Sequence, residues 1–277
     1  MSKKLKVYYA KVPNMGDMLN KDIISKCFGY EVVRNTYLTG KVSGIGSGLG
    51  NYTYEEEKWK NFLKAVSSVF YPEVYIWGTG FVKYKDHDTK FYKKKTHICA
   101  VRGELSRKRV EKIKGSELDV PLGDAGILAS RLLDKMPEKK YRVGIIAHYK
   151  EQDAPVFQKL LDRFEDSAFI DVRGTPFDVT QKIAECETII SSSLHGLIIA
   201  DSLGVPNHHI VVTDKLLGDG FKFDDYYSAY ELKHDFTDMN KGDINSLSEV
   251  TERYGIDHEA VKKKQKQMID CFPFPPV

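Results

Sequence analysis

Three consecutive serines followed by leucine, histidine and glycine form the stretch of this sequence best suited to chemistry. Its members are Ser191, Ser192, Ser193, Leu194, His195 and Gly196. The apolar residues 188–190 before it predict a buried strand, and residues 197–203 after it have the spacing of a helix. A strand that enters a helix through small polar residues presents backbone N–H groups and hydroxyls to an anion such as phosphate. His195 at this place can move a proton near neutral pH.

A structural interpretation fits the same run of residues. Ser193 is a good helix N-cap, and a histidine between apolar segments can be a hydrogen-bonded core residue. The sequence pattern alone favours neither interpretation over the other, so a proton-transferring His195 and a core His195 are both retained.

Other polar or small residues stand where predicted strands end. In open α/β sheets, the carboxyl ends of the strands line the ligand crevice. The residues placed there by the predicted strands are Asn14, Gly16, Asp17, Gly78, Arg102, His148 and Arg173. Ordinary alternatives are helix capping for Asp17, an ion pair for Arg102, and an ion pair with Asp171 or Asp178 for Arg173.

Composition describes a globular protein with an ordinary core. The 277 residues are 42% hydrophobic and 29% charged, and the net charge is +3. The lysine runs at 93–95 and 262–264 predict solvated faces, so nucleic acid is not an expected partner. Four widely spaced cysteines predict reduced thiols and no metal site. No apolar run approaches the roughly 18 residues of a membrane span, which leads us to expect a soluble, cytoplasmic protein.

Strands and helices alternate in two successive halves separated by a polar, proline-containing stretch at residues 135–140. We therefore expect an α/β fold with two Rossmann-like parallel-sheet domains that face a cleft. The predicted domains are an acceptor-side domain at 1–138, a donor-binding domain at 139–245, and C-terminal helices with a tail at 246–277. This arrangement resembles that of glycosyltransferase-B enzymes.

Several short segments, taken in chain order, resemble the polysaccharide pyruvyl transferases. They are Asn-Met-Gly-Asp at 14–17, Gly-Ile-Gly-Ser at 44–47, Trp-Gly-Thr-Gly-Phe at 77–81, Val-Arg-Gly at 101–103, Leu-Gly-Asp at 122–124, the serine–histidine run at 191–196, Ala-Asp at 200–201, Gly-Val-Pro at 204–206, and Phe-Lys-Phe-Asp-Asp-Tyr-Tyr at 221–227. Each segment is common alone, but their order along nearly the whole chain is specific.

The resemblance implies a reaction and its substrates. The enolpyruvyl unit of phosphoenolpyruvate would be transferred to two hydroxyls of one sugar, giving a cyclic pyruvate ketal and phosphate. The acceptor would belong to a capsular, exopolysaccharide or wall glycan, often as a lipid-linked precursor at the membrane surface. Phosphoenolpyruvate is then a donor substrate, and no cofactor or metal is expected.

The resemblance also implies roles for individual residues. The donor would lie against residues 191–196, with His195 transferring protons and Arg102 reaching across the cleft. Asp17 or Asp124 would orient the sugar or act as a second base, although helix capping is an alternative for both. Asn14, Gly16 and Gly78 would line the sugar side, and His148 would contact substrate.

Ser193 departs from the family pattern, because some members carry an arginine immediately before the Leu-His pair. The donor phosphate and carboxylate need a cation, and the candidates are Lys222 and Arg173. Lys222 lies between Phe221 and Phe223, which can pack inward while the lysine faces the cleft, so we expect Lys222 to contact the donor.

Two other functions are compatible with the same fold. One is a glycosyltransferase that uses a nucleotide sugar, and the other is a non-catalytic module that binds a glycan or an anion.

Overall fold

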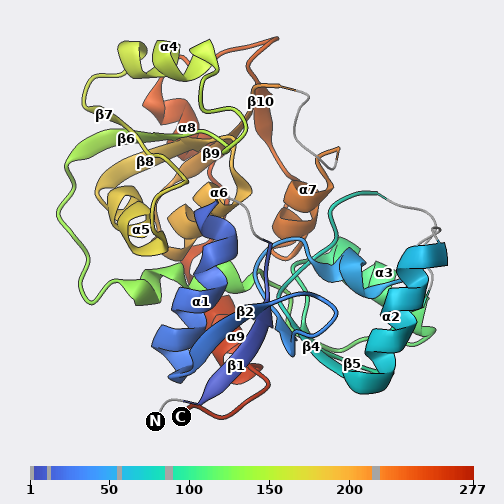
Figure 1. Ribbon diagram of the computed structural model, residues 1–277. Helices are drawn as coiled ribbons and strands as arrows, with labels where there is room; N and C mark the ends of the chain where they lie inside the picture. The colour runs from blue at the N-terminus through green and yellow to red at the C-terminus, as the bar shows by residue number, and fades with distance from the viewer. Residues whose placement is uncertain (1–2, 11–13, 55–57, 85–89, 214–218) are drawn as a thin grey trace.

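Parallel β-sheets form the framework of the protein. The computed structural model describes residues 3–10, 14–54, 58–84, 90–213 and 219–277. Within these residues, the first sheet has the order β2-β1-β3-β4-β5 (Figure 1). Its strands are β1 (Lys4–Tyr8), β2 (Glu31–Asn35), β3 (Val42–Ser43), β4 (Glu73–Trp77) and β5 (Lys95–Ala100).

The second sheet of the described chain repeats this arrangement with the order β10-β9-β8-β6-β7. Its strands are β6 (Tyr141–Ile146), β7 (Ser167–Phe169), β8 (Cys186–Ser191), β9 (Asn207–Val211) and β10 (Phe236–Asp238). In each sheet, the first strand lies between the second and the third, so the direction of winding reverses between the first and the third strand. Ligands of open α/β sheets bind at such a switch point. The predicted α/β fold with two Rossmann-like parallel sheets is confirmed.

Helices connect the strands and surround both sheets (Figure 1). The α-helices are α1 (Met15–Phe28), α2 (Lys58–Phe70), α3 (Glu104–Lys114), α4 (Pro155–Arg163), α5 (Pro176–Ala184), α6 (Leu194–Ser202), α7 (Phe221–Ser228), α8 (Leu247–Arg253) and α9 (His258–Asp270), and the 3₁₀ helices are η1 (Leu49–Tyr52) and η2 (Ala125–Leu132). Their ends follow local chemistry: Asn14 caps α1, and Gly29 ends it with a φ of 78°.

Two helices differ from the sequence prediction. Helix α6 begins at Leu194, one turn before residue 197, because the backbone becomes helical immediately after the extended Ser193. His195 therefore lies in the first helical turn. The glycines and aromatic residues of the stretch 218–227 predict a loop, but Phe221–Ser228 form helix α7, which starts after Gly220 at a φ of 86°. Residue 218 lies outside the described residues.

The two halves share one apolar core. Helix α1 packs on α5 and η2, and the Met15 amide donates to the Val172 carbonyl at 2.8 Å. Met15, Trp77 and Ile198 belong to the same buried cluster. The boundary predicted at residues 138 and 139 lies in the connection between η2 and β6.

The C-terminal segment packs against the first half (Figure 1). The indole N–H of Trp77 donates to the Met268 carbonyl in α9 at 2.9 Å. Phe272 stacks on Phe28 with ring centroids 3.7 Å apart, and the Val277 amide donates to the Phe28 carbonyl. Within the segment predicted at 246–277, residues 268–277 thus complete the core beside β4 and α1, whereas α8 packs on β8 and β9 of the second sheet.

A buried ion pair joins α7 to the segment that follows β5. The Arg102 guanidinium lies 2.9 Å from the Asp225 carboxylate, and both side chains are inaccessible to solvent. Arg102 also donates to Ser47 Oγ and to the Phe81 carbonyl. Asp225 accepts further hydrogen bonds from the amide and the hydroxyl of Ser106. Both charges are fully hydrogen-bonded, as buried charges need to be.

The Asp225→Ala variant should unfold more easily by about 3–5 kcal/mol, because it leaves the Arg102 charge buried without a counter-ion. Urea denaturation measures this loss. Asp171→Ala is the matched control, since it removes the partner of the exposed Arg173 and should leave the midpoint nearly unchanged. Equal effects of the two substitutions would contradict the structural role assigned to the buried pair.

Candidate active site

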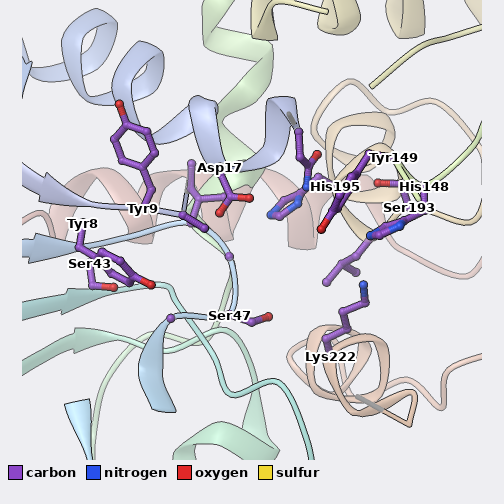
Figure 2. A pocket seen from close by; sticks show the side chains of 16 residues that line it. Tyr8, Tyr9, Asp17, Ser43, Ser47, His148, Tyr149, Ser193, His195 and Lys222 are labelled. Carbon is purple, nitrogen blue, oxygen red and sulfur yellow. The ribbon is translucent and has the colours of Figure 1, made fainter. Parts of the chain in front are cut away.

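A cavity of about 220 Å³ lies where the two switch points meet (Figure 2). The first half contributes the end of β1, the start of α1 and the loop after β3. The second half contributes the residue after β6, the start of α6, and a lysine of α7. The lining residues that carry functional groups are Tyr8, Tyr9, Asn14, Asp17, Ser43, Ser47, His148, Tyr149, Ser193, His195 and Lys222.

Serine hydroxyls organise the turn from β8 into α6. Ser191 Oγ accepts from the Ser193 amide and donates to the Ser193 carbonyl, both at 3.0 Å. Ser192 Oγ accepts from the His148 amide at 2.9 Å, which joins this turn to the end of β6. A Cβ at Gly196 would approach Ser191 Oγ to 2.7 Å, so the turn needs glycine there. Ser191 and Ser192 therefore shape the site, and the cavity wall is formed further along the turn.

Ser193 occupies the N-cap position of α6, as the structural interpretation expected. Its side chain, however, makes no capping hydrogen bond. The residue lines the cavity together with Leu194, next to backbone N–H groups of the first helical turn, which have no partner inside the helix. This end of α6 is chemically suited to an anion.

His195 is almost fully buried and packs against the start of α1. A Cβ at Gly16 would lie 2.1 Å from His195 Nδ1, so only glycine allows the imidazole to occupy this place. The Nε2 atom has no hydrogen-bond partner in the described structure. Burial, followed by the charges of Lys222 and Arg102, lowers the pKa of His195 to about 3. The imidazole is therefore neutral at pH 7, and its unpaired Nε2 is itself inaccessible to solvent.

Lys222 extends from α7 toward the side of the cavity formed by His148, Ser193 and His195 (Figure 2). Burial and the Arg102 charge lower the pKa of Lys222 to about 8. His148 is also neutral, because burial and the Lys222 charge lower its pKa to about 4. The rings of Phe221 and Phe223 are buried, as predicted for the residues on either side of this lysine.

Asp17 supplies the carboxylate of the cavity. Burial raises the pKa of Asp17 to about 6, and this effect is opposed by the Ala10 amide and by the charges of Arg34 and Lys222. At neutral pH the site thus holds a carboxylate, an ammonium group and two uncharged imidazoles. Such a set can bind an anion and transfer protons.

The remaining predicted residues lie outside the cavity wall. Arg102 is enclosed by its ion pair and reaches the cavity only through Ser47. Arg173 is exposed and forms a two-oxygen ion pair with Asp171, which is one of the alternatives considered from the sequence. Asp124 is buried and caps η2 by accepting from the Gly126 amide.

Gly78 and Asn14 complete the predicted set, and Asn14, unlike Arg102, Arg173 and Asp124, lies in the cavity wall. Gly78 adopts a φ of 87° and packs against the Ala125 amide, where a Cβ would come within 2.7 Å. Asn14 caps α1 through the Gly16 amide at 3.2 Å and also lines the cavity. Gly78 therefore supports the fold near the site, whereas Asn14 can contact a ligand.

The sequence interpretation missed several residues of the cavity wall. Tyr8 ends β1, Tyr9 follows it directly, Ser43 ends β3, and Ser47 lies in the loop after β3. Their position at or just after strand ends was the available signal, but tyrosine is also common inside strands.

Two searches of the described residues complete the description of the site. No group of three or more His, Cys, Asp or Glu side chains is arranged to hold a metal ion in that part of the chain. Within the same residues, no helix has the length and apolarity needed to cross a bilayer.

Comparisons with known proteins agree with the geometry of the second half. The family model for polysaccharide pyruvyl transferase matches residues 127–214. The uncharacterized protein L143 of Acanthamoeba polyphaga mimivirus is 30% identical over 233 residues, which cover 82% of this chain and 75% of that protein. Succinoglycan biosynthesis protein ExoV of Rhizobium meliloti (strain 1021) is 27% identical over 134 residues, which cover 48% of this chain and 40% of ExoV.

One solved structure is also similar in outline. A functionally uncharacterized protein from Klebsiella pneumoniae subsp. pneumoniae NTUH-K2044 aligns with a TM-score of 0.47 and 12% identity, over 83% of this chain and 88% of that one. The sequence relationships, by contrast, include the residues from η2 through α6 that build the second switch point. On these relationships, this chain belongs to the polysaccharide pyruvyl transferase family.

Proposed function

We propose that this protein transfers the enolpyruvyl unit of phosphoenolpyruvate onto two hydroxyls of a sugar in a polysaccharide or a lipid-linked precursor. The two hydroxyl oxygens form bonds to C2 of the donor, and the C2–O bond to phosphate breaks. Of the two protons lost by the hydroxyls, one is added to C3 of the donor, and the other is carried away by the released phosphate. Family membership and the relationship to a succinoglycan biosynthesis protein support a pyruvyltransferase role.

The observation that carries this proposal is the convergence of Lys222, the α6 N-terminus and the neutral imidazole of His195 in one cavity. An ammonium group and helix N–H donors suit the phosphate and carboxylate of the donor. We place the donor against Ser193, His195 and Lys222. Arg102 acts on the site indirectly, because its guanidinium pairs with Asp225 and donates to the Ser47 hydroxyl of the opposite wall at 2.8 Å.

His195 suits proton transfer in this arrangement. Because its imidazole is neutral, His195 can accept a proton from an attacking hydroxyl. A bound anion favours imidazolium, so the donor itself would raise the pKa of His195 toward its ordinary range. The same side chain could then return the proton to the donor carbon.

The acceptor sugar is assigned to the first half of the site. Asp17, with its raised pKa, is a candidate base for the second hydroxyl. Asn14 and Tyr9 offer polar and aromatic surface beside it. The donor and the acceptor would thus be held by opposite switch points of one cavity.

The cavity is large enough for the donor. Its volume of about 220 Å³ accommodates the ten heavy atoms of phosphoenolpyruvate.

A phosphate-release assay with phosphoenolpyruvate and a panel of galactosyl, mannosyl and glucosyl acceptors tests the proposal. Acceptor-dependent release of one phosphate per ketal supports it. Turnover of a nucleotide sugar would instead support a glycosyltransferase. Ligand binding without any turnover would support the non-catalytic module.

The His195→Gln variant should lower turnover about 10²–10⁴-fold with little change in melting temperature, because it removes proton transfer and keeps a polar side chain. Steady-state phosphate release and thermal unfolding measure both quantities. His97→Gln is the control, since His97 is exposed and pairs with Glu73 on the surface. A marked loss of stability with turnover retained in the folded fraction would favour a core role for His195.

The Lys222→Ala variant should raise the KM for phosphoenolpyruvate roughly ten- to hundredfold, which corresponds to losing a charge-assisted contact of about 1.5–3 kcal/mol. The KM for the acceptor should stay nearly constant. Arg173→Ala is the matched control and should resemble wild type, because its guanidinium already pairs with Asp171 outside the cavity. The reverse pattern would move the donor contact to Arg173.

The pH profile of kcat/KM should rise through about pH 6 and fall above about pH 8. Asp17 acts as a base only when deprotonated, and Lys222 binds an anion only when protonated. In the Asp17→Asn variant, the remaining rise of kcat/KM on the acid side should follow the titration of the donor phosphate. The Lys222→Arg variant should stay active above pH 8, because a guanidinium keeps its charge there. Limbs that neither substitution alters would contradict both assignments.

A further inference from the structure

Helix α2 presents its apolar face to solvent. Six large hydrophobic side chains of this helix are exposed, out of fourteen in the described chain. They are Trp59, Phe62, Leu63, Val66, Val69 and Phe70, with exposed fractions from 41% to 74%. Their spacing places most of them on one helical stripe. The helix lies at the right-hand edge of the molecule in Figure 1, with Tyr71, also exposed, directly after it.

The opposite face of α2 is polar and buried. Lys64, Ser67 and Ser68 are turned toward the protein, and Lys64 is inaccessible to solvent. The helix is thus inverted relative to an ordinary surface helix, whose apolar stripe faces the core.

Hydrogen bonds hold the helix in this orientation. Lys64 Nζ donates to the Thr53 carbonyl at 2.6 Å and lies 5.7 Å from the ring centroids of Tyr37 and Tyr92. Lys93, two residues before β5, donates through Nζ to Ser67 Oγ at 3.0 Å and to the Tyr71 carbonyl at 2.7 Å. Rotating α2 to bury its apolar face would break these contacts and leave buried ammonium groups without hydrogen-bond partners. Burying an unpaired charge is strongly destabilising.

Two exposed lysines lie near the C-terminal end of α2. Lys94 and Lys95 follow Lys93 directly, and the Lys95 amide donates to the Pro72 carbonyl just beyond the helix. The sequence before the helix is mixed in charge, because Glu55, Glu56 and Glu57 precede Lys58. Positive charge is therefore assigned to the C-terminal end of the helix, near Tyr71.

This combination matches a helix that lies in the interface of a membrane. Such helices expose aromatic and aliphatic side chains with lysines beside them, and tryptophan and tyrosine favour the headgroup level.

We propose that α2 docks this protein on the surface of an anionic lipid bilayer, with Trp59, Phe62 and Phe70 inserted among the headgroups and Lys94 and Lys95 against lipid phosphates. The helix lies along the surface, since thirteen residues are too few to span the membrane. Docking through α2 does not require that the chain transfers pyruvate.

Co-sedimentation of the full chain with vesicles tests the proposal. The chain should bind vesicles of phosphatidylcholine with 30% phosphatidylserine and bind pure phosphatidylcholine at least tenfold more weakly. The Trp59→Ser/Phe62→Ser/Phe70→Ser variant should lose binding by more than tenfold. Its matched control is Met136→Ser/Phe177→Ser/Phe236→Ser, which removes three exposed hydrophobics located elsewhere and should bind like wild type.

A charge variant probes the electrostatic part separately. Lys94→Gln/Lys95→Gln should weaken binding to the anionic vesicles roughly tenfold to thirtyfold, whereas Lys262→Gln/Lys263→Gln, in the other exposed lysine run, should not. Unfolding midpoints close to wild type establish that each variant is folded. Absence of vesicle binding overturns the proposal. Sedimentation of a dimer that only the α2 variant dissociates would overturn it in favour of self-association.

Discussion

The ion pair between Arg102 and Asp225 is the interaction on which the site depends. It has no solvent access, and its hydrogen bonds to Ser47, Phe81 and Ser106 satisfy both charges. Asp225 belongs to α7, so the pair fixes the helix that carries Lys222 against the end of β5. Because Arg102 also holds Ser47, one buried contact positions side chains on two walls of the cavity. A surface ion pair could not do this, since solvent and side-chain freedom would weaken it.

Repetition of one sheet order explains why the cavity collects residues from distant parts of the chain. Both sheets have a switch point between their first and third strands, and the shared apolar core holds the two switch points face to face. Every residue of α6 is buried, so His195 is held by a rigid element and by the close approach of Gly16. Ser191 and Ser192 form their hydrogen bonds within the turn and with the His148 amide. The proposed chemistry of the site therefore rests on Ser193, His195, Lys222 and Asp17.

Local patterns predicted the sheets and much of the cavity from sequence. The short apolar run at residues 188–190 located β8 and placed His195 after a buried strand. What failed depends on distant contacts. Whether Arg102 faces a cleft or an aspartate 123 positions away cannot be read from its neighbours. The loop predicted at 218–227 failed over residues 221–227 for the same reason, because Phe221 and Asp225 of α7 pack in the first half of the protein.

Two regions retain features that lower stability in the isolated chain. In the cavity, Arg102 and Lys222 lie near two histidines, and each cation lowers the pKa of its neighbours. Folding thus holds together groups that repel a further positive charge, which an anionic ligand would relieve. At α2, a lysine is buried while six large hydrophobics meet water. Sequences that specify a single fold generally avoid such arrangements, except where function requires them. That exception applies to both regions, because the proposed donor would neutralise the cations and a bilayer would cover the apolar face.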